Sequence, residues 1–246
     1  MEDIFARTRM LWGDSAVNHL SRCRVAVFGI GGVGGHATEV LARSGIGALD
    51  LIDGDCVSSS NINRQIVALQ STIGKPKVEV AKQRILDINP LCTVRTHALF
   101  YLPDKSCDID FSQYDYVADC IDTISAKIDI IIQCKKAGIP IISCMGAANK
   151  LDPTAFRVSD ISQTRMDPLA KIIRKKLRLL GIHGVKVVFS EEPPIKPVGS
   201  FIDTDNSSQR IPPASNAFVP ASAGLVLGGE IIKSLIQLAP KDTTEK

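Results

Sequence analysis

The sequence predicts an α/β protein with a doubly wound, mostly parallel, Rossmann-like sheet that carries helices on both faces. Short apolar runs alternate with helical stretches through residues 1–150, which is the order that produces right-handed βαβ units. Aromatic residues make up only 5% of the chain, so aliphatic side chains must fill the core, as in parallel strands covered by helices. A glycine-rich turn at residues 29–34 directly follows the first apolar run, where this fold binds its ligand.

The elements of the first half follow one another closely. One amphipathic helix is predicted over the first 20 residues, and the first strand, residues 24–29, ends at a glycine. Gly45 stops the next helix, residues 32–44, because glycine favours the backbone conformation at a helix end. The remaining elements are strands at 48–53, 93–98, 114–120 and 139–144 and helices at 75–89 and 125–137.

The pattern changes after Gly146. We expect extra strands at 154–158 and 185–190 on the C-terminal side of the sheet, a basic helix at 167–180 and a closing helix at 220–238. Residues 191–215 are rich in Pro, Ser, Asp and Asn. Long loops of this kind are usually functional or disordered, so we expect a flexible lid.

Composition excludes several classes of protein. Hydrophobic residues at 45% and charged residues at 22% exclude a mostly disordered chain, and a net charge of +3 is too small to indicate nucleic acid binding by itself. The seven cysteines are scattered without a C-x-x-C pair, which indicates a reducing, cytoplasmic protein without structural zinc. Glu230 and Lys233 favour a buried closing helix; peripheral membrane association through this helix is the less favoured alternative.

The glycine turn has the pattern G-x-G-x-x-G between a strand and a helix. Backbone N–H groups at the start of such a helix bind phosphate. Asp53 ends the second strand, where a carboxylate can accept hydrogen bonds from ribose hydroxyl groups. The alternative is a turn that serves packing alone, and the motif does not choose between NAD, FAD and ATP.

The residues after Asp53 favour ATP. Asp55 adds a second carboxylate, and Arg64 and Lys77 could neutralise a polyphosphate. For either cation alone, a solvated surface charge is the alternative. Asp122 and Thr123 follow the fourth strand, where a carboxylate can hold Mg²⁺ against phosphate oxygens; the alternative is that one of them caps the next helix.

Four motifs occur in one order: G-x-G-G-x-G, D-x-D-x-V-x-x-S-N-x-x-R-Q, G-x-P-K and D-x-x-D. Over residues 5–160 this series resembles the ubiquitin-activating-enzyme-like (ThiF/MoeB/HesA) superfamily. The resemblance implies that Asp53 binds ribose, that residues 60–64 and Lys77 bind the ATP phosphates, and that Asp122 handles Mg²⁺. It also implies a homodimer in which Arg9 reaches the partner's site.

The complete set of candidate residues combines the motifs with this resemblance. The candidate catalytic residues are Arg9, Arg64, Lys77 and Asp122, and Asp122 is the candidate metal ligand. The candidate ATP-binding residues are Gly29, Gly31, Gly32, Gly34, Asp53, Asp55, Ser60, Asn61, Asn63, Arg64, Gln65, Lys77, Asp122 and Thr123.

Two branches of the superfamily compete. The absence of C-x-x-C pairs, the start at residues 5–14 and the stretches 146–154 and 168–171 resemble the tRNA threonylcarbamoyladenosine dehydratases. That branch implies ATP-dependent adenylation of a threonyl carboxylate in the tRNA anticodon loop, followed by intramolecular ring closure without a catalytic cysteine. The alternative is an adenylyltransferase that activates the C-terminus of a ubiquitin-like sulfur-carrier protein.

The basic helix is the candidate contact with tRNA. Its cations are Lys171, Arg174, Lys175, Lys176 and Arg178, and cations on one surface can bind the RNA backbone; a solvated helix face is the alternative. Asp167 stands where some relatives carry a cysteine, which argues against a sulfur-donor or cysteine-desulfurase partner. We therefore interpret the chain, 1–246, as one adenylation domain with a nucleotide-binding core, 1–150, and a tRNA-binding and dimer-forming extension, 151–246.

Overall fold

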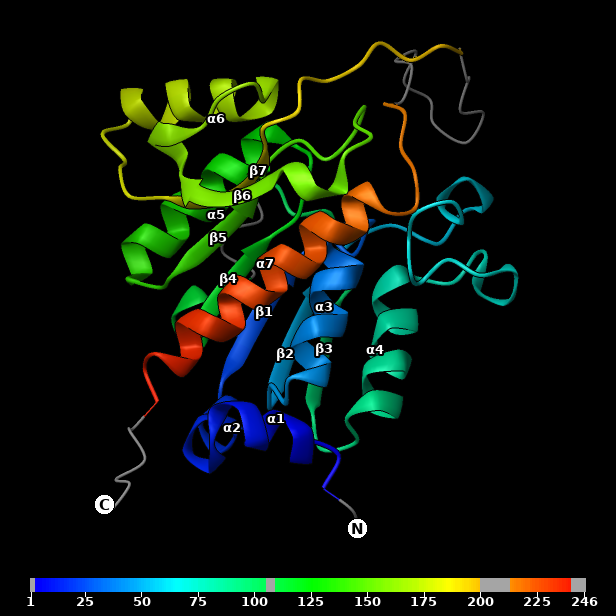
Figure 1. Cartoon of the computed structure of the whole chain (residues 1–246), viewed down its shortest axis with the longest axis vertical. Helices are drawn as coiled ribbons and strands as arrows, with labels where there is room; N and C mark the ends of the chain where they lie inside the picture. The colour runs from blue at the N-terminus through cyan, green and yellow to red at the C-terminus, as the bar shows by residue number, and fades with distance from the viewer. Residues whose placement is uncertain (1–2, 105–108, 200–212, 240–246) are drawn as a thin grey trace.

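The computed structural model describes residues 3–104, 109–199 and 213–239. Its centre is a seven-stranded sheet with the order β3-β2-β1-β4-β5-β7-β6. All neighbouring strands are parallel except β6 and β7. The doubly wound, mostly parallel sheet with extra strands on the C-terminal side is therefore confirmed (Figure 1). Residues 200–212 of the predicted lid lie outside the described residues.

The observed elements lie within a few residues of the predicted ones. The strands are β1 Arg24–Phe28, β2 Ala48–Ile52, β3 Thr93–His97, β4 Tyr116–Asp119, β5 Ile141–Cys144, β6 Phe156–Asp160 and β7 Lys186–Ser190. The helices are α1 Ala6–Trp12, α2 Asp14–Leu20, α3 Gly34–Arg43, α4 Lys77–Ile88, α5 Ile124–Ala137, α6 Pro168–Leu179 and α7 Val219–Ile236. The first 20 residues are helical as predicted, but Gly13, with φ of 84°, divides them into α1 and α2, and this backbone conformation favours glycine.

Two apolar layers lie on opposite faces of the sheet. Side chains alternate along a strand, so Val25 and Val27 of β1 join one core with α3, α4 and α7, whereas Ala26 and Phe28 join another core with α5 and α6. Figure 1 shows α3, α4 and α7 lying across one face of the strands. The helices on both faces follow from this alternation.

Helix α7 lies unusually close to α3. A Cβ atom on Gly224 would lie 2.3 Å from the Val33 carbonyl oxygen, and one on Gly228 would lie 2.8 Å from Val40 Cβ. Glycine at both positions therefore lets the two helices touch through backbone. By length and composition α7 could cross a membrane, but half of it is buried within the protein, where it covers one face of the sheet as a core helix.

The carboxyl ends of the parallel strands meet at one edge of the sheet. The glycine turn follows β1, Asp53 follows β2, Asp122 follows β4 and Gly146 follows β5. Helices α1 and α2 lie at the other end of the strands (Figure 1). The predicted nucleotide site is therefore assembled at one edge, and the N-terminal helices are outside it.

Candidate functional site

The glycine turn combines tight packing with one open position. A Cβ atom on Gly34 would lie 1.7 Å from the Gly29 carbonyl oxygen, and one on Gly29, whose φ is 86°, would lie 2.9 Å from the Cys120 carbonyl oxygen. A Cβ atom on Gly32 would lie 3.2 Å from Pro220 Cβ. Gly31 differs, because the nearest atom to its Cβ position would be Gln65 Nε2 at 3.9 Å. Packing alone explains Gly29 and Gly34 but leaves Gly31 with space for a ligand.

Asp53 joins the end of β2 to this turn. Its Oδ2 accepts a hydrogen bond from the Ile30 N–H at 2.6 Å, and its Oδ1 accepts from the Asp55 N–H at 2.8 Å. Burial raises the pKa of Asp53, while the positive charge of Lys77 and these two N–H groups oppose the rise. Each carboxylate oxygen accepts more than one hydrogen bond, so the fixed carboxylate can still receive ribose hydroxyl groups.

Lys77 is a buried cation that pairs with the carboxylate of Asp55. Its Nζ lies 2.7 Å from Asp55 Oδ2. The Lys77 side chain is 6% exposed and the Asp55 side chain 51% exposed. The ammonium group is therefore positioned from within the protein, and its partner faces the solvent.

The segment before α4 is shaped mainly by its own polar groups. Asn61 Oδ1 accepts from the Ser58 N–H at 3.2 Å, and the Ser58 and Ser60 hydroxyl groups lie 2.8 Å apart. Arg64 Nη1 donates to the Ser60 carbonyl oxygen at 2.9 Å and to Asn63 Oδ1 at 2.8 Å. Ser60, Asn61 and Asn63 thus hold the turn from which Arg64 extends.

Gln65 is the member of this segment that faces the glycine turn. It is 7% exposed, and its Oε1 is a buried acceptor without a hydrogen-bond partner among the described residues. Its Nε2 lies nearest the open side of Gly31. A buried amide oxygen without a partner is costly, so Gln65 could accept a hydrogen bond from a ligand on this side of the turn.

Asp122 stands on a loop supported by a buried ion pair. Asp119 and Lys127 are both fully buried, and Lys127 Nζ lies 3.0 Å from Asp119 Oδ2. Lys127 and Asp119 both bond the Ser143 hydroxyl group, and Asp119 Oδ1 accepts from the Ile121 N–H at 3.2 Å. Sequence reasoning missed this group because Asp119 ends β4 and Lys127 belongs to α5, so the two side chains meet only when the helix packs on the sheet.

The exposed carboxylate of Asp122 is free to act on a ligand. The Thr123 hydroxyl group lies 3.5 Å from its Oδ1. Thr123 occupies the N-cap position of α5, as the alternative expected, but its side chain makes no capping hydrogen bond. No group of three or more His, Cys, Asp or Glu side chains that could hold a metal occurs in residues 3–104, 109–199 and 213–239.

Arg9 lies far from this edge within its own chain. It belongs to α1, at the opposite end of the strands (Figure 1). Its guanidinium group pairs with Asp3 at 2.7 Å and Asp14 at 3.2 Å and donates to Asn18 Oδ1 at 3.0 Å. Arg9 therefore takes no part in the site of its own chain.

Helix α6 is fastened to the loop after β5. Asp167 accepts hydrogen bonds from the Ala170 N–H at 3.0 Å and from the Gly146 N–H at 2.9 Å. This buried carboxylate caps the helix and fixes its start at the carboxyl edge of the sheet. Asp167, which the sequence comparison marks only as the residue in place of a cysteine, therefore has a structural role.

The cations of α6 are not equivalent. Lys171, Lys175, Lys176 and Arg178 are exposed. Arg174 is half-buried, and its Nη1 donates to the Thr164 carbonyl oxygen at 2.7 Å. Four of the predicted RNA contacts therefore face the solvent, and the fifth also holds the preceding turn.

The described part of the predicted lid returns to the site before α7. The Asn63 side chain donates to the Ser215 carbonyl oxygen at 3.2 Å. Asn149 is joined to Ala214 by two hydrogen bonds of 2.8 Å. Residues 213–215 thus connect the segment that carries Arg64 with the loop after β5.

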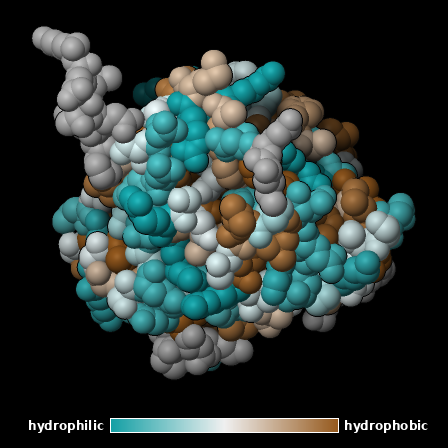
Figure 2. Space-filling model, turned by 90° about the horizontal axis from the view of Figure 1, so that it is seen from below, coloured by the Kyte–Doolittle hydropathy of each residue, from teal (hydrophilic) through white to brown (hydrophobic). Residues whose placement is uncertain are grey.

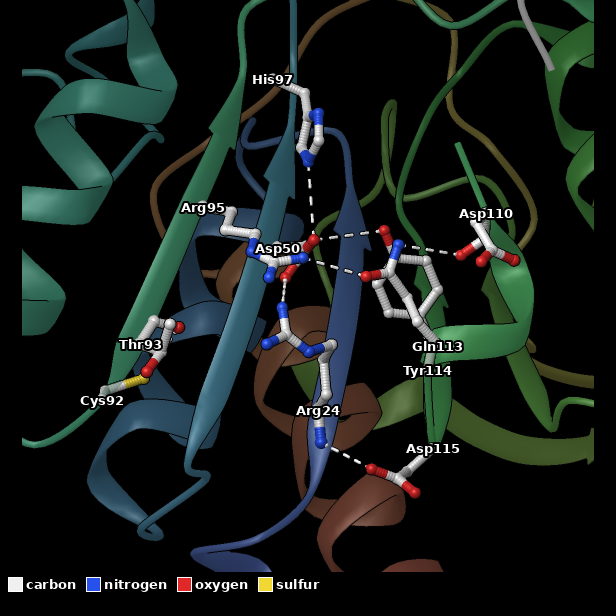
Figure 3. A network of polar contacts seen from close by, with 10 residues as sticks. All are labelled: Arg24, Asp50, Cys92, Thr93, Arg95, His97, Asp110, Gln113, Tyr114 and Asp115. Carbon is white, nitrogen blue, oxygen red and sulfur yellow. Dashed lines mark hydrogen bonds and ion pairs between the residues drawn. The ribbon is translucent and has the colours of Figure 1, made fainter. Parts of the chain in front are cut away.

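Asp50 forms a second buried polar network, in the middle of β2 (Figure 3). Its carboxylate contacts Arg24 Nη1 at 2.7 Å, the Tyr114 hydroxyl group at 3.3 Å and His97 Nε2 at 3.5 Å. These partners fasten the segment before β4 to the sheet. Because Asp50 lies within the strand and not at its carboxyl end, this network belongs to the fold.

Two cysteines near the site, Cys120 and Cys144, are poor nucleophiles. Burial raises the pKa of the Cys144 thiol to about 12 and that of Cys120 well above its ordinary value. Both therefore remain protonated at neutral pH, whereas the thiolate is the reactive form.

Comparison with known proteins identifies the family of the chain. The model of the ThiF family matches residues 5–246. The tRNA threonylcarbamoyladenosine dehydratase of Bacillus subtilis (strain 168) is 46% identical over 240 residues, which cover 95% of this chain and 94% of that protein. The molybdopterin-synthase adenylyltransferase of Salmonella typhimurium is 38% identical over 133 residues, which cover 54% of this chain and 52% of that protein.

Solved structures agree with this ranking. The E. coli tRNA N6-threonylcarbamoyladenosine dehydratase in complex with ATP superposes with a TM-score of 0.83 and 35% identity, covering 95% of this chain and 94% of that one. The same protein in complex with AMP gives a TM-score of 0.85 and 36% identity, with the same coverage. The similarity therefore extends through α6, β7 and α7 and is not confined to the nucleotide-binding core.

Proposed function

The chain belongs to the ThiF family, and we propose that it is an ATP-dependent enzyme that dehydrates threonylcarbamoyladenosine in the anticodon loop of tRNA to a cyclic form. The observation that carries the proposal is the convergence of the open glycine turn, Asp53 and Lys77 at one edge of the sheet. The near full-length similarity to a dehydratase, against about half the length for the carrier-activating relative, supports this substrate over a carrier protein.

The first step is adenylation of the threonyl carboxylate. A carboxylate resists substitution because oxide is a poor leaving group. One of its oxygens forms a bond to the α-phosphorus of ATP, and the bond from that phosphorus to the bridging oxygen of pyrophosphate breaks. The nucleophile is already ionised, so catalysis consists of positioning and charge neutralisation, which we assign to Arg64 and the buried Lys77.

The second step closes the ring. A nucleophilic atom of the neighbouring carbamoyl group bonds the acyl carbon, and the bond from that carbon to the AMP oxygen breaks, so the electron pair leaves with AMP and a proton passes to solvent. Because both groups belong to one substrate, no covalent enzyme intermediate is needed. The raised pKa values of Cys120 and Cys144 agree with a mechanism that uses neither thiol.

A Mg²⁺ ion fits the donor set through Asp122. Mg²⁺ in nucleotide sites is usually held by one or two carboxylates together with substrate phosphates, without a cage of protein ligands. Asp122 is exposed at the edge where the phosphates would lie. When bound, the ion neutralises charge on the phosphate oxygens. The chain's own contribution is to hold Asp122 in place through the Asp119–Lys127 pair below it.

We assign tRNA binding to α6 and the residues around it, within the extension 151–246. The exposed cations Lys171, Lys175, Lys176 and Arg178 can bind phosphate groups of RNA. Asp167 holds the start of this helix at the loop after β5, so its cations lie beside the edge that carries the nucleotide site. A substrate in tRNA also supports a cytoplasmic location.

We further propose that the active form is a homodimer with Arg9 acting in the partner's site. Arg9 cannot act in its own chain, because α1 lies at the wrong end of the strands. Beside it on α1, Met10 is 88% exposed and Leu11 74% exposed. Figure 2 views the molecule from this end and shows apolar side chains gathered in the middle of the face. Such a surface suits a symmetric protein contact.

The test compares candidate substrates in one assay. The protein is incubated with ATP, labelled pyrophosphate and either tRNA that carries threonylcarbamoyladenosine, the same tRNA without the modification, or a ubiquitin-like sulfur carrier. We expect pyrophosphate exchange into ATP and AMP release only with the modified tRNA, together with loss of 18 mass units, one water, from the modified nucleoside by mass spectrometry. Exchange driven by a carrier protein alone would instead establish the adenylyltransferase alternative.

A further inference from the structure

Lys150 is a buried lysine in the loop that follows β5. It is 3% exposed, and its Nζ donates to the Glu192 carbonyl oxygen, just after β7, at 2.6 Å. An ammonium group has three N–H donors, and Lys150 uses one of them within the described part of the chain, residues 3–104, 109–199 and 213–239. A lysine is rarely buried so deeply unless it is paired with a charge, yet no carboxylate of these residues bonds its Nζ. Two donors can therefore bind a further group.

The two carboxylates whose charges act on Lys150 are committed to backbone groups. Burial lowers the pKa of Lys150, while the negative charges of Asp167 and Glu192 oppose the fall. The Glu192 carboxylate accepts from the Leu151 and Asp152 N–H groups at 2.9 Å, and Asp167 caps α6. Hydrogen bonds from backbone N–H groups offset part of each negative charge. A carboxylate brought to Nζ by a substrate would thus supply the direct partner that this ammonium group does not have among the described residues.

The backbone beside Lys150 is held from two sides. The Asn149 N–H donates to the Ala214 carbonyl oxygen, and the Asn149 carbonyl oxygen accepts from the Ile195 N–H, both at 2.8 Å. Asn216 Nδ2 donates to the Lys150 carbonyl oxygen at 2.9 Å. Asn149 has φ of 58°, a conformation that asparagine adopts more readily than most residues. The lysine therefore stands on a preorganised loop, which is what a ligand-binding group requires.

The strand order places this lysine beside the nucleotide site. The middle of the sheet has the order β2-β1-β4-β5, and Asp53, the glycine turn, Asp122 and Lys150 follow these strands in that order. With the ribose at Asp53 and the phosphates at the glycine turn, the part of the edge that remains for a second substrate is that of β4 and β5. An attacking carboxylate would therefore reach the α-phosphorus from the side that carries Lys150.

We propose that Lys150 binds the threonyl carboxylate of the RNA substrate, an inference that rests on the proposed function. The carboxylate and the triphosphate are both negative and repel each other. Arg64 and Lys77 are assigned to the phosphates, and a cation on the side of β5 offsets the charge of the arriving carboxylate. One carboxylate oxygen accepts a hydrogen bond from Nζ, and the other is free to bond the α-phosphorus.

The same contact serves the second step. After adenylation, the oxygen that accepts from Nζ is the carbonyl oxygen of the acyl-adenylate. Negative charge develops on this oxygen when the carbamoyl group attacks the acyl carbon, and a positioned cation stabilises that charge. Lys150 keeps its proton throughout, so it acts by its charge and takes no part in proton transfer.

The experiment separates the carboxylate from the rest of the RNA. Fluorescence anisotropy measures the binding of two anticodon stem-loops in the presence of α,β-methylene ATP, which cannot release pyrophosphate. One stem-loop carries threonylcarbamoyladenosine, and the other carries its carboxamide, which has nearly the same shape without the charge. We expect wild-type protein to prefer the carboxylate, and Lys150→Met to reduce this preference by roughly 10- to 150-fold, the range for a hydrogen bond to a charged group.

A second variant and a matched control complete the test. Lys150→Gln keeps a donor for the Glu192 carbonyl oxygen but has no charge, so it should lose the preference as well, and it carries the test if Lys150→Met does not fold. Lys196→Met removes an exposed lysine from the segment after β7, so the ratio of the two affinities should stay at the wild-type value even if both RNAs bind more weakly. Urea unfolding and ATP affinity verify that each variant is folded with an intact nucleotide site.

The ratio of the two affinities decides between a substrate contact and a structural lysine. If the folded Lys150 variants keep the wild-type ratio, or if wild-type protein binds both stem-loops equally, the inference is wrong. The proposed function still stands in that case, provided that modified tRNA supports pyrophosphate exchange. If wild-type protein exchanges no pyrophosphate with modified tRNA, the proposed function fails and the inference fails with it.

Discussion

The carboxyl end of the sheet holds its groups rigidly from inside the chain, whereas the amino end presents groups that the chain itself does not use. At the carboxyl end, Gly34 has no space for a Cβ atom, and Asp119 and Lys127 form a fully buried ion pair. At the amino end, Arg9 pairs with Asp3, before α1, and with Asp14 of α2, and Met10 beside it is 88% exposed. The carboxyl end is held in place by contacts within the chain, and the proposed dimer contact lies at the amino end.

This difference separates two kinds of substitution. At the carboxyl end, a substitution acts first on packing, because backbone and buried charge are in contact there. At the amino end, a substitution should leave the chain folded and act only on the assembled dimer. Each of the following predictions tests one side of this contrast, beginning with the largest expected effect.

The largest effect is expected from exchange between two inactive variants. Arg9→Ala should stay folded and dimeric yet lose adenylation, since its charge is missing from the partner's site. Asp122→Ala should be inactive because its own site is incomplete. Mixing the two gives heterodimers in which one site keeps both groups, so activity should return to roughly a quarter of wild type for random exchange at equal amounts. The measurement is pyrophosphate exchange before and after mixing.

Proof of subunit exchange is the control for this result. Native mass spectrometry of differently tagged variants shows whether heterodimers form. If they form and activity stays absent, Arg9 acts within its own chain or has no catalytic role, and the contrast between the two ends is lost.

Two glycines of one turn should behave differently. Gly34→Ala places a Cβ atom 1.7 Å from the Gly29 carbonyl oxygen, so the backbone must shift, and we expect a loss of stability of about 1–3 kcal/mol, as for overpacking, with loss of ATP binding. Gly31→Ala meets its nearest atom at 3.9 Å, so it should fold normally but obstruct the phosphates. Urea unfolding and calorimetry with ATP measure the two effects.

The matched pair also tests whether the turn binds phosphate. Normal ATP affinity in Gly31→Ala would return the turn to a packing role. Equal destabilisation of both variants would show that the space above Gly31 is closed in solution.

Removal of one member of a buried ion pair should cost more stability than removal of one member of a half-exposed pair. Lys127→Met leaves the Asp119 carboxylate buried without its partner, and removal of one member of a buried pair costs about 3–5 kcal/mol. Lys77→Met leaves Asp55, which is 51% exposed, in contact with water, so its cost should be about 1 kcal/mol or less. Urea unfolding gives both values, and ATP binding should fail in Lys77→Met despite its stability.

The test is which variant, Lys127→Met or Lys77→Met, loses more stability. If Lys77→Met is the more destabilising variant, then the Lys77–Asp55 pair is a structural element and the assignment of Lys77 to phosphate binding is in doubt. Lys82→Met, at a half-buried position of the same helix α4, is the control for loss of one lysine.

The sequence predicted those parts of the fold that depend on the order of residue types within one short segment. Apolar runs and glycine stops predicted the strands of the core to within a few residues, because side-chain alternation and helix ends are local properties. The break at Gly13 was missed because an amphipathic pattern continues across it. The Asp119–Lys127 pair was missed because its members meet only after α5 packs on β4, and no local rule places a charge in a core.

The cations of α6 illustrate the same limit at the site. Arg174 and Lys175 are neighbours of like charge in the sequence, and nothing local distinguishes them. In the structure Arg174 turns towards Thr164, whereas Lys175 faces the solvent. Burial on a helix depends on what packs against it, which the sequence of the helix alone does not contain.

The smallest effect is expected on the salt dependence of tRNA binding. Loss of one phosphate contact lowers the slope of log affinity against log salt by roughly 0.7–0.9. Lys175→Ala should reduce the slope by about this amount, since its ammonium group is exposed, and should leave stability unchanged. Arg174→Ala should instead cost about 1.5–3 kcal/mol of stability, as for a charged hydrogen bond, with a smaller change in slope because its guanidinium group donates to Thr164.

Binding of modified tRNA across a salt series and urea unfolding of both variants test this contrast directly. Neither substitution touches the glycine turn or Asp53, so ATP affinity should stay at the wild-type value in each. A Lys175→Ala slope equal to wild type would make the outer face of α6 an ordinary solvated surface. An equal reduction of the slope in both variants would mean that Arg174 leaves Thr164 when RNA binds. In that case all five predicted cations would contact RNA. In either case the slope of the Lys171→Ala variant decides how far the contact extends towards Asp167, because Lys171 is the exposed cation nearest the start of the helix.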